Sequence, residues 1–332
     1  MTVPPLADLL EGLRVVAIPM RVPFRGVRVR EAVVVVGPAG WGEFAPFLEY
    51  GPAESARWLA AAVEAAWDGW PEPVRGSVPV NATVPAVRPE EVPEVLARFP
   101  GCATAKVKVA ERGQSLRDDV ARVAAVRDAM GRGARIRVDA NGAWTVDQAA
   151  DALARLRRYD LEYAEQPCAA VKELRDLRLL LAHRGVDVPV AADESIRKAE
   201  DPLRVRALGA ADIIVVKVAP LGGVRRALAV VEACGLPAVV SSALDTSVGI
   251  AGGVALAAAM PTLEHACGLG TVALLQGDVT AEPLVPDGGM LAPRPVVADE
   301  DLLDRWAAPP ERATWWWSRV AAAHAHLDGS RE

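Results

Sequence analysis

Five charged side chains in the middle of the chain each follow a short apolar run. They are Lys108, Asp139, Glu165, Asp193 and Lys217, and successive members are 31, 26, 28 and 24 residues apart. Each interval is about the length of one strand plus one helix. If the runs are parallel strands of a barrel, the five side chains lie at equivalent heights. They then meet at the carboxyl-end mouth, where barrels place their active sites.

Three of the five are carboxylates, and bringing them together requires a cation. Burying Asp139, Glu165 and Asp193 side by side is costly, because like charges repel and each group loses its hydration. Three hard oxygen ligands suit Mg²⁺, which keeps positions open for water or for a substrate carboxylate. We therefore predict one Mg²⁺ ion held by these three residues, and a small-molecule carboxylate as the substrate.

Lysine is rare in this chain, which makes its positions informative. Only five of the 37 basic residues are lysines, and Lys106, Lys108 and Lys217 fall on these strand ends. Arginine cannot act as a base near neutral pH, whereas a lysine can be tuned to lose its proton. A lysine beside Mg²⁺ suits abstraction of the proton next to a carboxylate, since the metal stabilises the enediolate that forms. Lys108 and Lys217 are the predicted catalytic residues; strand geometry turns Lys106 the same way as Lys108, and Asn141 the same way as Asp139.

The surrounding pattern predicts a barrel. From residue 78, short apolar runs alternate with amphipathic helical segments, which is typical of a parallel sheet covered by helices. Eight such runs over about 200 residues favour a (β/α)7β-type TIM barrel, and no G-x-G-x-x-G motif follows the first run. The predicted strands are 78–84, 104–109, 135–141, 161–167, 187–195, 211–218, 236–242 and 263–268.

The N-terminal region has a different pattern and predicts a separate domain. Residues 14–50 predict antiparallel strands, and a helix is expected after Pro52. Pro71, Pro73 and Gly76 then interrupt the chain. We predict an α+β capping domain formed by 1–76, a barrel domain over 77–294, and a C-terminal segment, 295–332, that packs on the cap.

Composition and charge exclude several classes of protein. A net charge of −6 and a sequence pI near 5.5 provide no basic footprint for nucleic acid. The longest apolar stretch, 248–260, is too short to cross a bilayer, so no membrane association is expected. The N-terminus has no basic start or cleavage site of a signal peptide, and four cysteines without CxxC spacing are expected to be free thiols. These features predict a cytoplasmic protein and leave its oligomeric state open.

Seven motifs make the chain resemble the enolase superfamily over nearly its whole length. The two lysine-bearing strands that flank Asp, Glu and Asp are similar to the muconate-lactonizing subgroup. Within it, SSALDTSVGIAGGVALAAAMP (241–261) followed by HACGLGT (265–271) resembles the o-succinylbenzoate synthases of menaquinone biosynthesis. The motifs are GWGEFAP (40–46), KVK (106–108), VDAN (138–141), AEQP (164–167), ADES (192–195), VVKVAPLGG (215–223) and SSALDTSVG (241–249).

The resemblance implies a Mg²⁺-dependent lyase that works through an enediolate intermediate. Its substrate would be 2-succinyl-6-hydroxy-2,4-cyclohexadiene-1-carboxylate, which loses water to give 2-succinylbenzoate. Lys108 would take the α-proton and then protonate the departing hydroxyl on the same face, a syn dehydration. Lys217 would stabilise the enediolate from the opposite face, and Lys106 would tune Lys108. The predicted substrate contacts are Lys106, Asn141, Ser241, Ser242 and Arg25 of the cap loop.

Two other functions fit the same residues. An N-acylamino acid (N-succinylamino acid) racemase of the same subgroup needs two opposed lysines, so the motifs do not exclude it. A non-catalytic barrel that serves as a binding or scaffold protein is the second alternative, although all five charged groups are present. Dipeptide epimerases of the subgroup usually carry an Asp-x-Asp pair after the last strand. This chain has Ala266–Gly270 there, with no acid, which disfavours that variant.

Overall fold

The structure, a computed structural model, describes residues 3–197 and 202–328. Its first part is a three-stranded antiparallel sheet in the order β1-β2-β3. Strand β1 spans Arg14–Phe24, β2 spans Val27–Gly37 and β3 spans Gly40–Phe44. Arg25 and Gly26 join β1 to β2 with φ of 51° and 78°, as a tight two-residue hairpin requires.

The two faces of this sheet pack against different neighbours, because successive side chains of a strand point to opposite sides. Val33 and Val35 of β2 join the cluster formed with the cap helices, whereas Val34 joins the core shared with the second part of the molecule. Trp316 is buried in the cap cluster and meets the ring of Phe44 edge to face at 6.0 Å. The cap helices are α1 (Leu6–Glu11), α2 (Pro52–Val63) with its π-helical continuation η1 (Glu64–Asp68), α12 (Glu300–Arg305) and α13 (Pro310–Asp328).

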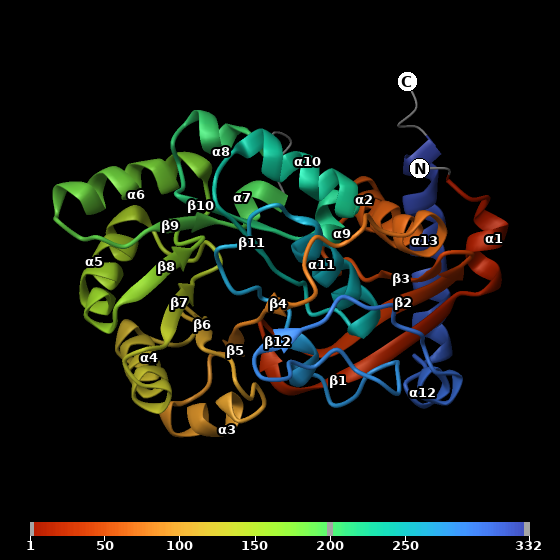
Figure 1. Cartoon of the computed structure of the whole chain (residues 1–332), viewed down its shortest axis with the longest axis horizontal. Helices are drawn as coiled ribbons and strands as arrows, with labels where there is room; N and C mark the ends of the chain where they lie inside the picture. Colours follow the sequence, from red (N-terminus) through yellow and green to blue (C-terminus); the bar gives the residue numbers. More distant parts are fainter. Residues whose placement is uncertain (1–2, 198–201, 329–332) are drawn as a thin grey trace.

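The second part is a parallel seven-stranded sheet in the order β11-β10-β9-β8-β7-β6-β5. Figure 1 shows these strands with helices along their outer side, next to the cap. The strands are β5 (Ala82–Val84), β6 (Thr104–Lys108), β7 (Arg135–Asp139), β8 (Leu161–Glu165), β9 (Val190–Ala192), β10 (Ile213–Val216) and β11 (Ala238–Val240). A short antiparallel pair, β4 (Val78–Pro79) with β12 (Met290–Leu291), lies beside them.

Helical segments separate the parallel strands, and local sequence starts several of them. Ser115 and Asp118 form a capping box at the start of α4, as Thr145 and Gln148 do for α5. The segments are η2 (Pro89–Glu91), α3 (Val92–Leu96), α4 (Leu116–Met130), α5 (Val146–Leu156), η3 (Arg157–Tyr159), α6 (Val171–His183), α7 (Glu194–Arg197), α8 (Arg204–Ala207), α9 (Val218–Leu221), α10 (Val224–Cys234), α11 (Ser247–Ala259) and η4 (Thr271–Leu274).

The inner face of the parallel sheet is polar on one side and apolar on the other. Ala105 and Val107 of β6 pack outward in the large core, so Lys106 and Lys108 face inward. On β10 and β11, by contrast, inward positions are apolar, and they form a separate buried cluster with a tyrosine and an alanine. That cluster consists of Tyr163, Ala191, Ile213, Val215 and Val239. Charged side chains therefore concentrate on the strands from β6 to β8.

The predicted eighth strand, 263–268, is not formed as a strand. Only two isolated parallel bridges occur there, Cys267 with Val80 and Gly268 with Ser241. A Cβ added at Gly268 would lie 2.5 Å from Ser241 Oγ, so a larger residue there would require the Ser241 side chain to move. The predicted strand 187–195 is also shorter, because helix α7 begins at Glu194 directly after β9.

The apolar stretch 248–260 is a buried helix of the molecule. It corresponds to α11, where residues on all sides of the helix are buried. Within residues 3–197 and 202–328, no helix is long and apolar enough to cross a membrane. All four cysteines are free thiols, as their spacing predicted, and Cys168, Cys234 and Cys267 are buried.

A buried polar cluster joins the cap to the loop after β11. The carboxylate of Glu43, on β3, accepts hydrogen bonds from the backbone of Thr246 at 3.1 Å and of Gly249 at 3.1 Å. Arg30, on β2, donates to the carbonyl of Leu244 at 3.1 Å. Burial, together with the nearby Asp245 carboxylate, raises the pKa of Glu43 to about 8. The GWGEFAP motif thus contributes a carboxyl group that joins the two parts of the molecule.

This cluster predicts a pH-dependent stability. The pKa of Glu43 is higher in the folded chain than the ordinary value of 4.5, so the folded state holds an extra proton between about pH 4.5 and 8. Stability should therefore fall as pH rises through that window, by at most about 1.4 kcal/mol per pH unit from this group. Glu43→Gln should remove this component, so that urea unfolding of the variant depends less on pH. Parallel curves for the two proteins from pH 5 to 8 would contradict the assignment.

Candidate active site

Strand pairing brings the predicted charged groups to one end of the sheet. Lys108 of β6 pairs with Asp139 of β7, and Asp139 pairs with Glu165 of β8, so these three stand in one row. Asp193 follows the end of β9, and Lys217 follows β10 as the N-cap of α9. All five side chains are buried. The structure therefore brings together the five side chains whose spacing is about one strand plus one helix.

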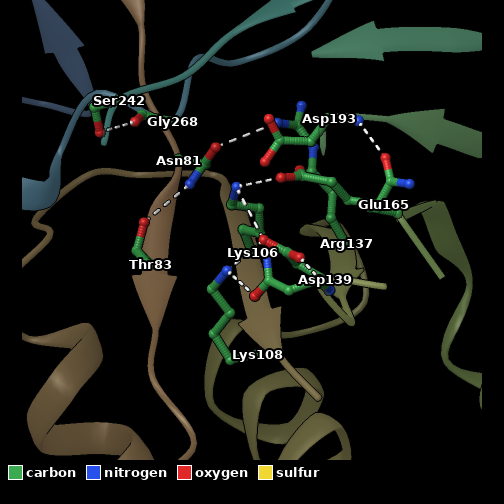
Figure 2. A network of polar contacts seen from close by, with 12 residues as sticks. Asn81, Thr83, Lys106, Lys108, Arg137, Asp139, Glu165, Asp193, Ser242 and Gly268 are labelled. Carbon is green, nitrogen blue, oxygen red and sulfur yellow. Dashed lines mark hydrogen bonds and ion pairs between the residues drawn. The ribbon is translucent and has the colours of Figure 1, made fainter. Parts of the chain in front are cut away.

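Each carboxylate of this group contacts a lysine. Figure 2 shows the contacts that Lys106 and Lys108 make with Asp139 and Glu165. Lys108 Nζ lies 2.5 Å from Asp139 Oδ2, and Lys106 Nζ lies 2.8 Å from Glu165 Oε1 and 3.4 Å from Asp139 Oδ2. Lys217 Nζ lies 2.6 Å from Asp193 Oδ2. The ammonium groups thus offset the charges of the carboxylates, which makes their joint burial possible.

The two lysines of β6 differ in proton affinity although they stand two residues apart. Burial lowers the pKa of Lys108, and the nearby charge of Lys106 adds to this, against the opposing effect of Asp139. Burial would also lower the pKa of Lys106, but the carboxylates of Glu165 and Asp139 outweigh it and raise that pKa. Lys106 therefore remains charged, whereas Lys108 gives up its proton more easily. Separated pKa values in one site are a common mark of acid–base assignments.

The pKa values of Glu165 and Asp139 also differ. Burial raises the pKa of Glu165 to about 7, and the neighbouring Asp139 carboxylate raises it further. Burial also acts on Asp139, but the ammonium groups of Lys108 and Lys106 hold its pKa far below the usual range. Glu165 is therefore less well compensated by ammonium groups than Asp139, and it takes up a proton more easily.

The donor chemistry of the three carboxylates fits a hard divalent cation. Within the described parts of the chain, no three Asp, Glu, His or Cys side chains are grouped as a ready metal site, since each carboxylate faces a lysine. Glu165 Oε2 is buried and has no hydrogen-bond partner. An unsatisfied buried carboxylate oxygen is costly, and a cation between neighbouring strand ends would satisfy it. These observations fit the prediction that Mg²⁺ is bound by Asp139, Glu165 and Asp193, and the assignment stays a prediction.

A cavity of about 120 Å³ lies between this cluster and the cap. Lys106, Lys108, Asp139 and Lys217 form part of its wall, so both predicted catalytic lysines face the same space. The predicted substrate contacts Arg25, Asn141, Ser241 and Ser242 line it as well, whereas Glu165 and Asp193 do not.

The predicted contacts already have partners within the protein. Asn141, at φ 48°, accepts a hydrogen bond from Lys108 Nζ through Oδ1 at 2.8 Å. Arg25 Nη2 lies 3.6 Å from Glu194 Oε1. The hydroxyl of Ser242 bonds to the carbonyl of Gly268 at 2.8 Å and to Thr271 Oγ1 at 2.8 Å. Their roles toward a substrate stay predictions.

Sequence reasoning missed several residues of this cavity. The ring of Phe24, at the end of β1, lies 5.0 Å from the Lys108 ammonium in a cation–π contact. Thr83 and Thr271 also line the cavity. Phe24 directly precedes the tight turn at Arg25 and Gly26, but that local signal does not indicate which part of the barrel the turn meets.

The family models match both parts of the chain. A model described as enolase C-terminal domain-like matches residues 91–298, and one described as enolase N-terminal domain-like matches residues 15–66. Among curated proteins, the o-succinylbenzoate synthase of Thermobifida fusca is 59% identical over 312 residues, which are 94% of this chain and 96% of that protein. The o-succinylbenzoate synthase of Mycolicibacterium smegmatis is 60% identical over 324 residues, 97% of this chain and 98% of that protein.

Solved structures show the same fold at lower identity. The muconate lactonizing enzyme from Pseudomonas putida has a TM-score of 0.75 and 22% identity, covering 90% of this chain and 100% of that chain. The L-Ala-D/L-Glu epimerase from Bacillus subtilis has a TM-score of 0.72 and 22% identity, covering 86% of this chain and 96% of that chain. At these identities the likeness concerns the fold alone.

The ion pairs predict the effect of removing Lys106. Lys106→Met leaves the Glu165 carboxylate buried without its ammonium partner, so the free energy of unfolding should drop by about 3–5 kcal/mol in EDTA at pH 8. The loss should be smaller at pH 6, where Glu165, with a pKa near 7, takes up a proton. Urea unfolding measures both values. Lys172→Met, at an exposed position of α6, is the control and should change stability by less than about 0.5 kcal/mol. An equal, small effect of both substitutions would contradict the prediction.

Proposed function

Because the chain belongs to the o-succinylbenzoate synthase family of the enolase superfamily, we propose that it catalyses the corresponding dehydration. The substrate is 2-succinyl-6-hydroxy-2,4-cyclohexadiene-1-carboxylate, and the product is 2-succinylbenzoate, an intermediate of menaquinone biosynthesis. The enzyme is then a hydro-lyase that breaks a carbon–oxygen bond.

The observation that carries the mechanism is that Lys108 and Lys217 face one cavity. Lys108 Nζ, in its neutral form, takes the proton from the carbon next to the ring carboxylate, and an enediolate results. The same ammonium then protonates the departing hydroxyl, so that water leaves from the same face and the ring becomes aromatic. The lowered pKa of Lys108 supports its role as the base, because a base must first be without its proton.

Mg²⁺ is the proposed cofactor, with Asp139, Glu165 and Asp193 as its ligands. When bound, the ion would neutralise the substrate carboxylate and favour the negative charge that develops on it. The unpartnered Glu165 Oε2 supports this assignment. When the cation is bound, its charge would offset the carboxylates. Lys106 and Lys108 would then no longer need all of their ion pairs with Glu165 and Asp139.

The remaining polar residues of the cavity receive binding roles. Lys217 would stabilise the enediolate from the face opposite Lys108, and the charged Lys106 would contact the carboxylate. Arg25 of the cap hairpin would close the cavity over a dianionic substrate. Asn141, Ser241 and Ser242 would contact the substrate from the barrel side. Their position on the cavity wall supports these roles.

The finer architecture is also proposed. The parallel bridges at Cys267 and Gly268 lie between β11 and the segment before β5, which supports a closed (β/α)7β-type barrel. The proposed domains are the cap formed by 1–76, the barrel over 77–294 and the C-terminal segment 295–332 packed on the cap. The cap core shared by Trp58 and Trp316 supports the last assignment. Residues 1–2 and 329–332 lie outside the described residues.

We also propose a cytoplasmic location, which four free thiols support.

The mechanism predicts a strong dependence on Lys108 and on Mg²⁺. Lys108→Ala should lower kcat by about 10²- to 10⁴-fold, the usual contribution of a general base. EDTA should abolish turnover, and added Mg²⁺ should restore it. Formation of 2-succinylbenzoate measures activity, and circular dichroism checks that each protein is folded. Lys172→Ala, on the exposed face of α6, should retain full activity.

Two outcomes would contradict this assignment in different ways. Folded protein that does not dehydrate the substrate in excess Mg²⁺ would exclude the synthase function and favour a non-catalytic barrel. Full activity of Lys108→Ala would retain the function but assign the base to another residue.

Two lysines facing one cavity are also the arrangement that a two-base racemase requires. Such a site would exchange the α-proton of either enantiomer of an N-succinylamino acid with solvent. We expect that in D₂O any such exchange is slower than the dehydration, which proton NMR can measure. Exchange of both enantiomers that exceeds dehydration in kcat/KM would favour the racemase as the main activity.

A further inference from the structure

Gln166 contacts the backbone segments that carry the three predicted metal ligands. It directly follows Glu165 at the end of β8, its side chain is fully buried, and its backbone has a φ of 37°. A positive φ is uncommon for a residue other than glycine and is retained only where surrounding contacts enforce it. Those contacts lead to the two neighbouring strand ends.

The side-chain amide of Gln166 holds the segment that carries Asp193. Its Oε1 accepts hydrogen bonds from the backbone N–H of Asp193 at 2.9 Å and of Ser195 at 3.2 Å. Its Nε2 donates to Ser195 Oγ at 2.8 Å and to the carbonyl of Cys168 at 2.8 Å. Both donor hydrogens and both lone pairs of the amide are therefore used within the protein.

The backbone of Gln166 connects the remaining strand ends. Its N–H donates to the carbonyl of Ala191 on β9 at 2.7 Å. Its carbonyl accepts a hydrogen bond from the N–H of Gly142 at 2.6 Å, in the turn that follows Asp139. One residue thus contacts the segments that present Asp139, Glu165 and Asp193.

We propose that Gln166 is a positioning residue that fixes, relative to one another, the three backbone segments from which the carboxylates would bind a divalent cation. The proposal rests on the Mg²⁺ site assigned under the proposed function. Gln166 itself lines neither the cavity nor the ion pairs, so its effect acts through the backbone of the ligand-bearing segments. Removing a residue that orients metal ligands typically weakens metal affinity 10- to 100-fold.

The proposal differs from a purely structural role in what it predicts for the metal. A buried amide that only stabilises the fold would lower the melting temperature when replaced, without changing the affinity for Mg²⁺. A positioning residue changes the affinity as well, because the ligands lose their fixed separation. Both quantities must therefore be measured on the same variants.

The test is titration calorimetry with Mg²⁺ on the full chain and on three variants. Gln166→Leu removes the hydrogen bonds of the amide at similar side-chain size, and we expect its Kd for Mg²⁺ to rise about 10- to 100-fold. Ser195→Ala removes one partner of the same amide and should raise Kd about 2- to 10-fold, which keeps the test valid if Gln166→Leu does not fold. Gln276→Leu is a control at an exposed position: its amide donates to the carbonyl of Met20, away from the carboxylates, and its Kd should stay within about twofold of the original.

Melting temperatures without Mg²⁺ complete the comparison. We expect Gln166→Leu to lower the melting temperature and to weaken Mg²⁺ binding, whereas Gln276→Leu, at an exposed position, should change both little. Unchanged Kd in Gln166→Leu and in Ser195→Ala would overturn the positioning role while leaving the Mg²⁺ site in place. Weakening of equal size in Gln276→Leu would also overturn it. If the original chain does not bind Mg²⁺, the metal assignment and this inference both fall.

Discussion

The central constraint on this protein is the burial of three carboxylates on adjacent strand ends. Asp139, Glu165 and Asp193 have little water around them, so their charges must be offset within the protein. Lys106, Lys108 and Lys217 supply ammonium groups at 2.5–2.8 Å from them. The proposed chemistry uses the same arrangement, because a cation bound to the carboxylates would free ammonium groups that already line the cavity.

The rest of the architecture supports this charged cluster. Strands from β6 to β8 bear charged side chains on their inner face, whereas β9 to β11 fill the interior with the apolar cluster around Val215 and Val239. The apolar cluster fills the interior, and the charged side chains of β6 to β8 meet Asp193 and Lys217, which follow β9 and β10, at the cavity end of the sheet. Their burial lowers the local dielectric, which strengthens the electrostatic interactions between them. The cap closes the cavity through Phe24 and Arg25, and the buried Glu43 couples it to the loop after β11.

The parts of the site that could be predicted are those that depend on a residue's own position in its strand. The parts that depend on contacts between distant segments could not be predicted. The positions of Lys108, Asp139 and Glu165 could be predicted, because each follows an apolar run at a strand end, and parallel strands that pair in register place such ends at equal height. The strand expected at 263–268 was wrong, because only Cys267 and Gly268 pair with the neighbouring segments, and the length of a ladder depends on partners far away in the chain. Gln166 was overlooked for a similar reason: its motif position gave no indication that its amide reaches the N–H of Asp193 on the next strand end.

By itself, the amino-acid sequence determined the alternation of strands and helices, the charged residues at the strand ends and the choice of lysine where a removable proton is needed. These follow from local periodicity and from the chemistry of single side chains. Only the tertiary structure decided which lysine contacts which carboxylate, that burial makes the pKa of Lys108 and Lys106 diverge, and that Phe24 covers the Lys108 ammonium. Each of these depends on distances between segments far apart in the chain, because electrostatic and desolvation effects are set by neighbours in space and not by neighbours in sequence.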